Sequence, residues 1–140
     1  MKKQNEKWNV LSVDLANRPG LCSGTIPSLL EISKLFEDGI ENFKHSMGLT
    51  NEYIAAKKKS TVALETSLCV HRWQFNDSLL IKTRASKFDG RKVLMQQMIC
   101  SKGQTLVTQT TLSISFDILK RKSCFFEKKI ALNYKRFIDF

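Results

Sequence analysis

A carboxylate beside an apolar helical surface is the strongest candidate for chemistry in this sequence. Between about residues 25 and 47, apolar side chains recur at intervals of three and four residues, as on one face of an α-helix. A wheel of ~100° per residue places Glu37 about 65° from the centre of that face, closer than Glu31, Asp38 or Glu41. Desolvation at such an edge suits a carboxylate to act as a base, and the other reading is a boundary residue in water. We therefore take Glu37 as the first candidate base.

Two other acids and a glycine-containing loop are also candidates. Asp14 ends the first predicted strand, and Glu65 lies in a later strand. Between them, the segment Asn17-Arg18-Pro19-Gly20 predicts a turn, and the loop continues to the start of the helix. Backbone N–H groups at a helix N-terminus stabilise a developing oxyanion, and small residues there let a carbonyl approach. The loop residues that we assign to such a site are Gly20, Ser23, Gly24 and Thr25, although the glycines equally satisfy turn geometry.

The histidines and cysteines do not predict a triad or a metal site. His45 and His71 are isolated from any serine or cysteine at a recognisable spacing. The four cysteines (Cys22, Cys69, Cys100 and Cys124) contain no Cys-x-x-Cys pair, so neither a zinc site nor a disulfide framework is expected. Cys69 and Cys100 fall in strand-like apolar runs, where a thiol usually behaves as a small buried hydrophobe. We expect all four cysteines to be structural and no metal to be bound.

The chain is strongly basic, with 23 Lys and Arg against 13 Asp and Glu and a formal net charge of +10. This surplus favours a polyanionic partner such as nucleic acid, anionic lipid or coenzyme A. Three clusters fall in predicted loops or element ends, where the alternative reading is a solvated surface. These clusters are Lys57-Lys58-Lys59, Lys87 with Arg91-Lys92, and Lys120-Arg121-Lys122.

The length of 140 residues predicts one domain, residues 1–140. No apolar run approaches the ~18 residues of a membrane span, and the N-terminus lacks the apolar segment of a signal peptide. We expect a cytoplasmic protein without membrane insertion.

The predicted elements give an α+β order. A strand over residues 8–15 precedes the helix, for which Thr25 is the expected N-cap, Pro27 lies in the first turn and Gly48 is the stop. Residues 60–116 read as strands, with Asp89-Gly90 as a hairpin turn, and the last three form an antiparallel meander. Residues 124–138 predict a short helix or, alternatively, an edge strand. An antiparallel sheet curved around one long helix covers these apolar faces.

This order, together with several segments, resembles the hotdog fold and its acyl-CoA thioesterase branch, the 4-hydroxybenzoyl-CoA thioesterase-like superfamily. The segments are Leu64-Glu65-Thr66-Ser67-Leu68, Asn76-Asp77-Ser78-Leu79, the hairpin from Lys87 to Lys92, and Gly103 to Gln109. Resemblance covers roughly residues 8–122. The family's loop Asp-x-x-Gly-His-x-Asn is not intact, because Asn17 and Leu21 stand for its acid and its histidine, unless Asp14 is the acid before a longer loop.

The resemblance implies hydrolysis of an acyl-CoA or acyl-carrier-protein thioester, with the thioester as substrate and no cofactor. Its implied catalytic positions here are Glu37, Asp14 and Asn17. Cations that would hold the coenzyme phosphates are Arg91 and Lys92, then Lys87, Lys58 and Lys59. It also implies a homodimer or homotetramer with the active site between subunits. Alternatives are a non-catalytic acyl-thioester-binding module and a dehydratase or hydratase, which Leu21 disfavours. A nucleic-acid-binding domain is the least favoured reading, because only Trp73 and Phe88 suit stacking.

Overall fold

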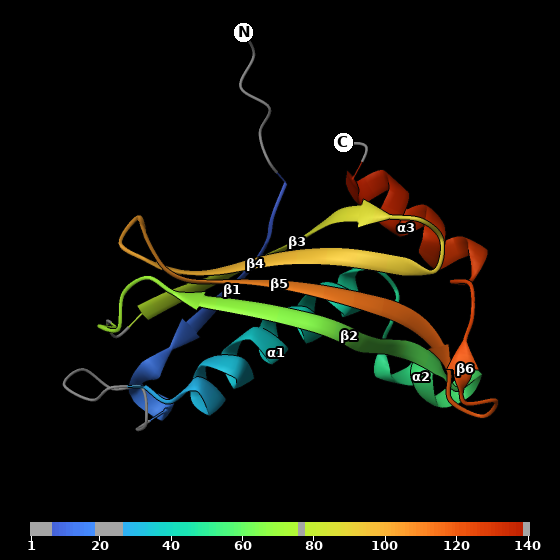
Figure 1. Ribbon diagram of the computed structural model, residues 1–140, viewed down its shortest axis with the longest axis horizontal. Helices are drawn as coiled ribbons and strands as arrows, with labels where there is room; N and C mark the ends of the chain where they lie inside the picture. Colours follow the sequence, from blue (N-terminus) through green and yellow to red (C-terminus); the bar gives the residue numbers. More distant parts are fainter. Residues whose placement is uncertain (1–6, 19–26, 76–77, 139–140) are drawn as a thin grey trace, which may run out of the picture.

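The computed structural model describes residues 7–18, 27–75 and 78–138 (Figure 1). Its elements follow the chain in a strand, helix, strand order. They are β1 (Asn9–Asp14), η1 (Leu15–Asn17), α1 (Leu29–Ser46), α2 (Asn51–Lys57), β2 (Lys59–Val70), β3 (Ser78–Phe88), β4 (Lys92–Ser101), β5 (Gln104–Asp117), β6 (Lys122–Ser123) and α3 (Lys128–Ile138).

The strands form one antiparallel sheet in the order β1-β3-β4-β5-β2, and β6 pairs with the end of β5. The predicted meander is therefore confirmed as β3, β4 and β5. Its turns use left-handed backbone, at Gly90 (φ 95°) and at Lys102 (φ 49°) with Gly103 (φ 76°). The first predicted strand pairs with β3 at one edge, and β2 pairs with β5 at the other.

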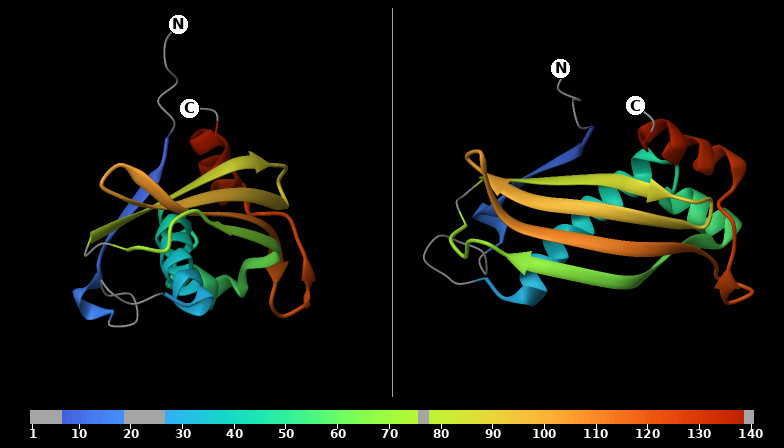
Figure 2. Two further views of the ribbon diagram at one scale, coloured as in Figure 1. Left: turned by 60° about the vertical axis from the view of Figure 1, so that its left-hand side comes forward. Right: turned by 45° about the horizontal axis from the view of Figure 1, so that its top comes forward.

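Helix α1 lies across the concave face of the curved sheet, which is the hotdog arrangement (Figures 1 and 2). The helix buries Ile32, Leu35, Phe36 and Phe43, and the first three pack with strand residues such as Ile81 and Ile99. The sequence-based wheel was wrong about the centre of this face. Leu29 and Leu30 are 58% and 66% exposed, whereas Ile32 in the same turn is fully buried. The buried face of α1 is therefore centred near Ile32, Gly39 and Phe43.

Gly39 marks the closest approach between α1 and the sheet. A Cβ atom at this position would lie 2.7 Å from Ile81 Cγ2 and 3.0 Å from Gln97 Nε2. The buried Gln97 side chain donates hydrogen bonds to the Phe36 carbonyl and to Thr83 Oγ1, both at 3.0 Å. The absence of a side chain at Gly39 thus lets the helix approach the sheet closely, and the hydrogen bond from Gln97 joins the two.

The helix ends differ from the expectation at one end and agree at the other. The N-cap is Ser28, whose Oγ accepts a hydrogen bond from the Glu31 N–H at 3.2 Å, rather than Thr25, which lies outside the described residues. Gly48 follows the C-terminal residue with φ 99°, as the sequence predicted. Helix α2 was missed, since its seven residues make only about two turns.

The predicted C-terminal helix is confirmed as α3. It buries Ile130, Tyr134 and Phe137 against a second apolar cluster around Phe43 and Val93. No helix in the described part of the chain is long and apolar enough to cross a membrane.

Strand β2 is an open edge. Its central residues are exposed on both faces of the strand, and a register shift at Leu64 interrupts its pairing with β5. Helix α1 lies mainly over β1, β3 and β4. The concave face of β2 is therefore exposed in the middle of the strand, whereas Leu68 and Val70 near its end pack against the core.

Candidate active site

Glu37 projects from α1 on the side of the helix that faces β2. Lys44, seven residues later, lies only about 20° from Glu37 around the helix axis and so shows which way this side of α1 faces. Lys44 Nζ donates a hydrogen bond to Ser60 Oγ in β2 at 3.2 Å. Glu37 is exposed, rather than bordering buried apolar surface as predicted. Its carboxylate is therefore open to a molecule that lies along β2.

The opposite side of α1 is joined to the segment that follows β1. The Arg18 guanidinium forms an ion pair with the Asp38 carboxylate. Asp14, the second candidate base, is exposed and caps η1, where its Oδ1 accepts a hydrogen bond from the Ala16 N–H at 2.9 Å. The structure thus places Asp14 and Glu37 on different sides of α1.

The proposed oxyanion residues Gly20, Ser23, Gly24 and Thr25 lie outside the described residues, as does the side chain of Asn17. What is described is the start of α1 at Leu29, eight residues before Glu37. At 1.5 Å per residue this separates the helix N-terminus from Glu37 by about 12 Å. The Glu37 carboxylate and the N–H groups at the N-terminus of α1 are therefore too far apart to act on one thioester carbonyl within one chain. Glu31, in the first turn, has a buried carboxylate oxygen without a hydrogen-bond partner among the described residues.

Lys44 is a buried cation that sequence reasoning did not single out. Its residue exposure is 8%, and burial lowers the pKa of its ammonium group, although the nearby Glu41 carboxylate acts in the opposite direction. A lysine in the middle of a predicted apolar face is the signal that could have identified it. Its side chain joins α1 to the start of β2, beside the face that carries Glu37.

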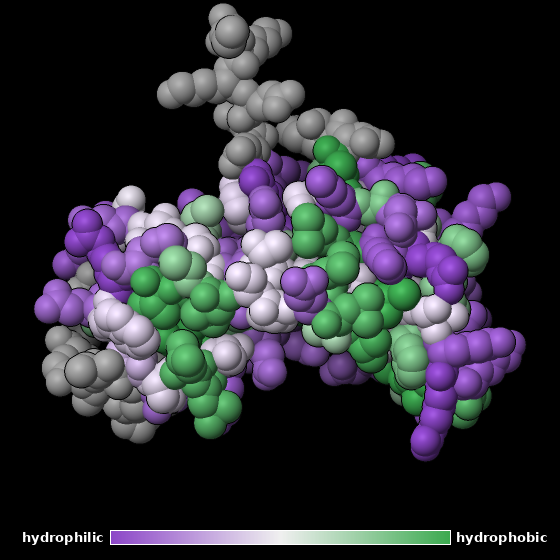
Figure 3. All heavy atoms as spheres, in the orientation of Figure 1, coloured by the Kyte–Doolittle hydropathy of each residue, from purple (hydrophilic) through white to green (hydrophobic). Residues whose placement is uncertain are grey.

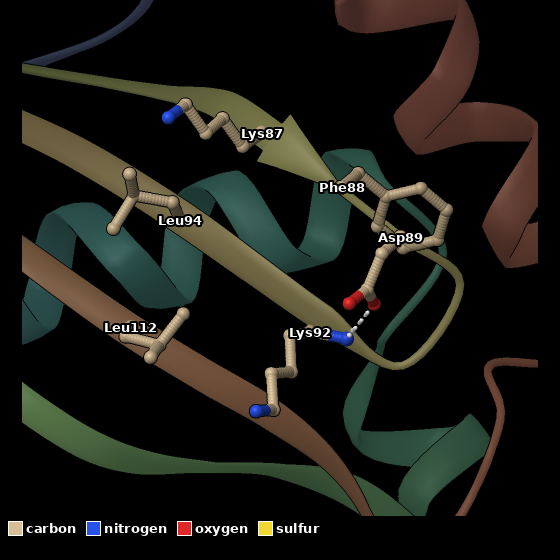
Figure 4. Close-up of a pocket in the computed structure, with 6 residues that line it drawn as sticks. All are labelled: Lys87, Phe88, Asp89, Lys92, Leu94 and Leu112. Atoms are coloured by element: carbon tan, nitrogen blue, oxygen red, sulfur yellow. Dashed lines mark hydrogen bonds between the residues drawn. The ribbon is translucent and has the colours of Figure 1, made fainter.

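The β3–β4 hairpin forms a depression of about 290 Å³ on the convex face of the sheet (Figure 4). Leu94 and Leu112 lie along its floor, and the predicted phosphate ligands Lys87 and Lys92 are among its lining residues. Asp89 fixes the turn, since its Oδ1 accepts hydrogen bonds from the N–H groups of Arg91 (2.9 Å) and Lys92 (2.7 Å). These bonds lower the pKa of the Asp89 carboxyl.

Arg91, although it belongs to the same hairpin, is engaged elsewhere. Its Nη2 donates a hydrogen bond to Ser123 Oγ at 2.6 Å, and its guanidinium lies over the Phe125 ring at 5.1 Å. Of the preferred pair of phosphate ligands, only Lys92 therefore lines the depression.

The depression and Glu37 lie on opposite faces of the sheet, because α1 is behind the strands that carry Lys87 and Lys92 (Figure 4). Glu65, the third candidate acid, pairs with Leu112 in the register of β2 and β5 and so belongs to the convex side. Lys58 and Lys59 lie at the junction of α2 and β2. The structure thus brings Lys87 and Lys92 together but separates them from Glu37.

Cys69 and His71 lie together, contrary to the expectation of an isolated histidine and a buried thiol. His71 Nδ1 is 4.0 Å from Cys69 Sγ, and His71 Nε2 is 3.0 Å from Thr108 Oγ1. Both residues are exposed, because they lie at the end of the open edge strand, whereas Cys100 is buried as predicted. The i, i+2 spacing on a strand was the available signal. Among the described residues, no three His, Cys, Asp or Glu side chains gather as a metal site.

Comparison with known proteins gives a consistent result. A family model described as the thioesterase-like superfamily matches residues 31–133. Among curated proteins, none matches the sequence.

Solved structures match the fold closely at low sequence identity. A hypothetical protein from Staphylococcus aureus in complex with CoA has a TM-score of 0.87 at 11% identity, over 99% of this chain and 89% of that one. A probable thioesterase from Bartonella henselae has a TM-score of 0.72 at 19% identity, over 86% and 100%. A DHNA-CoA thioesterase from S. aureus has a TM-score of 0.76 at 12% identity, over 92% and 89%.

Proposed function

The chain belongs to the thioesterase-like superfamily, and we propose that it hydrolyses an acyl thioester of coenzyme A or of an acyl-carrier protein. The observation that carries this proposal is the position of Glu37, an exposed carboxylate in the middle of the central helix on the side that faces β2. The S. aureus relative that binds CoA supports the choice of the coenzyme.

In the proposed reaction, Glu37 accepts a proton from water while the water oxygen bonds to the thioester carbonyl carbon. The oxyanion so formed is stabilised by backbone N–H groups. Its collapse breaks the carbon–sulfur bond, and the departing thiolate takes up the proton. The products are a carboxylic acid and the free thiol, with no cofactor consumed.

The distance along α1 supports a site that is shared between two copies of the chain. Glu37 and the helix N-terminus are about 12 Å apart, so we assign the base to one copy and the oxyanion donors to another. The open edge of β2 is where a second copy would pair, since its backbone groups and both faces are uncovered. The functional unit is then a homodimer, or a homotetramer of two such pairs, with the active site between subunits.

We favour Lys58 and Lys59 as ligands of the coenzyme phosphates over Arg91, Lys92 and Lys87. They lie at the start of β2, whereas Lys87 and Lys92 lie across the sheet from Glu37. Replacing Lys58 and Lys59 together by alanine should raise KM for acyl-CoA with little change in kcat. If the Lys87→Ala, Lys92→Ala pair raises KM instead, the coenzyme reaches the site from the convex face.

A non-catalytic acyl-thioester-binding module is the second candidate. It is favoured by the departure of the loop from Asp-x-x-Gly-His-x-Asn, where Asn17 and Leu21 stand for the acid and the histidine. A binding module keeps its affinity for acyl-CoA and releases no thiol.

The test is thiol release from acyl-CoAs of different chain types by the wild type, Glu37→Gln, Asp14→Asn and the matched control Glu52→Gln. Glu52 is an exposed acid on α2, outside the proposed site. Glu37→Gln should lower kcat about 10²–10⁴-fold, as expected for loss of a general base, while Glu52→Gln leaves it unchanged. Loss of activity in Asp14→Asn alone would move the base to Asp14. A wild type that binds acyl-CoA without thiol release would make the chain a binding module.

A further inference from the structure

The turn between β5 and β6 presents exposed apolar side chains at one end of the molecule. Leu119 is 76% exposed and Ile118 is 42% exposed, and neither belongs to the two core clusters. An exposed leucine alone would need no explanation. Here it belongs to the turn between β5 and β6, which projects at the lower right of the molecule (Figure 1).

Basic side chains surround this turn. Lys120, Arg121 and Lys122 follow Leu119 directly, and the Ile118 N–H donates a hydrogen bond to the Lys58 carbonyl at 2.9 Å, which places the α2–β2 junction beside the turn. In the described structure, the three cations of the turn form no ion pair. Hydrophilic and hydrophobic atoms lie side by side at this end (Figure 3). The surface, which we call the basic tip, comprises Lys57, Lys58, Lys59 and residues 118–122.

The turn is held in place by its own contacts. Asp117 Oδ1 accepts a hydrogen bond from the Lys120 N–H at 3.0 Å, and Lys122 pairs with Asp117 across the two strands. Arg121 takes the left-handed conformation (φ 52°) that closes the turn. Leu119 is therefore presented outward by an ordered turn.

We propose that the basic tip docks the protein on the surface of an anionic membrane. Apolar side chains flanked by Lys and Arg bind at the headgroup level, where the cations meet lipid phosphates and the apolar group leaves water. Nothing crosses the bilayer in this arrangement. Each cation near such a surface strengthens binding about fivefold, and burial of one leucine adds about tenfold or more.

Two other occupants fit the surface less well. An acidic protein would pair with the cations but would leave Leu119 in water unless it offered an apolar pocket for that side chain. A second copy of this chain would bring its own excess of positive charge, since the formal net charge is +10. The combination of an apolar apex and surrounding cations favours lipid.

The experiment is cosedimentation of the full chain with vesicles of phosphatidylcholine and phosphatidylglycerol (3:1) and with vesicles of phosphatidylcholine alone. The variants are Leu119→Asp and the pair Lys120→Glu, Arg121→Glu. The matched control is the pair Arg72→Glu, Lys102→Glu, which changes the net charge equally at the opposite end of the sheet and also includes a turn residue with positive φ. Melting temperature and mass by light scattering are recorded for every variant.

The wild type should bind the anionic vesicles, and added salt should weaken that binding. Leu119→Asp should weaken it about tenfold, and the Lys120, Arg121 pair by about 25-fold or more, while the Arg72, Lys102 pair retains most of it. Equal losses in both charge-reversal pairs would mean attraction by net charge alone and would overturn the proposal. So would a wild type that ignores anionic vesicles, or a Leu119→Asp variant that changes the oligomeric mass but not vesicle binding. Vesicle binding is measured without acyl-CoA, so its outcome is independent of the proposed hydrolysis.

Discussion

Replacing Gly39 by alanine should destabilise the protein, although alanine is the better helix former. In an unpacked helix the change would add about 1 kcal/mol of stability. Here the new Cβ would lie 2.7 Å from Ile81 Cγ2, 3.0 Å from Gln97 Nε2 and 3.1 Å from Thr83 Oγ1, all from buried residues. Overpacking of this kind costs about 1–3 kcal/mol, and displacement of Gln97 also weakens its bond to the Phe36 carbonyl. We expect a net loss of about 2 kcal/mol.

The loss is measured by urea unfolding and by the melting temperature, which should fall by about 8 °C for a chain of this size. Lys34→Ala, an exposed change on the same helix, is the control and should stay within about 0.5 kcal/mol. In a double-mutant cycle, Ile81→Ala removes the contacting methyl group, so the two losses should be less than additive by at least about 1 kcal/mol. A Gly39→Ala variant as stable as the wild type would refute the reasoning. Because α1 also carries Glu37, the same change should reduce turnover.

Three further predictions follow from charges and edges. Lys44→Met should stabilise the protein at pH 7, because the pKa of Lys44 is lower in the folded chain than its usual 10.5. Between the folded and the unfolded pKa, the unfolded chain binds a proton that the folded chain does not. The stability of the wild type therefore rises with pH in that range. The difference between wild type and variant should therefore shrink as the pH rises toward 10.5 in urea titrations. Asp89→Ala should lower the melting temperature at pH 7 but less at pH 3. The folded chain lowers the pKa of this carboxyl, so its stabilising effect declines as the pH falls below the usual value of 3.8. Equal losses at both pH values would contradict this. Light scattering should give a dimer of 16.1 kDa chains, and Leu64→Lys on β2 should dissociate it, whereas Ser12→Lys on β1 should not.

The fold followed from the sequence wherever a pattern was long. The helical period of α1 and the strands of the meander each extend over many residues, and tertiary packing did not alter them. The Asp89-Gly90 turn is short, but its residue types are a strong hairpin signal. The orientation of α1 about its axis did not follow. Leu29 and Leu30 are apolar but lie on the exposed side of the helix, whereas Gly39 lies on the buried side and allows close packing because it has no side chain. A wheel weighted by hydrophobicity cannot register that contribution.

The relative positions of the candidate residues were only partly predictable from the sequence. Lys87 and Lys92 do lie together, because Lys87 pairs with Leu94 across the hairpin and Lys92 lies two residues before Leu94 on the same strand. The sheet separates these lysines from Glu37. This separation was hard to predict, because a shift of one residue along a strand changes which side chains face α1. The pairing of Cys69 with His71 was missed for a related reason. Their common face is the convex side of an edge strand, where an apolar run is exposed.

The two edges of the sheet bear on the proposal that the active site is shared between two copies of the chain. β1 has six residues, whereas β2 has twelve and presents Val62, Leu64, Thr66 and Ser67 to solvent. A long, nearly uncharged edge of this kind is usually paired or covered, and α1 stops short of it. Glu37 faces that same uncovered strip, about 12 Å from the helix N-terminus that would stabilise an oxyanion. Pairing of a second copy at β2 would cover this edge. It would also bring the helix N-terminus of that copy to Glu37, so one contact would both protect the strand and complete the proposed site.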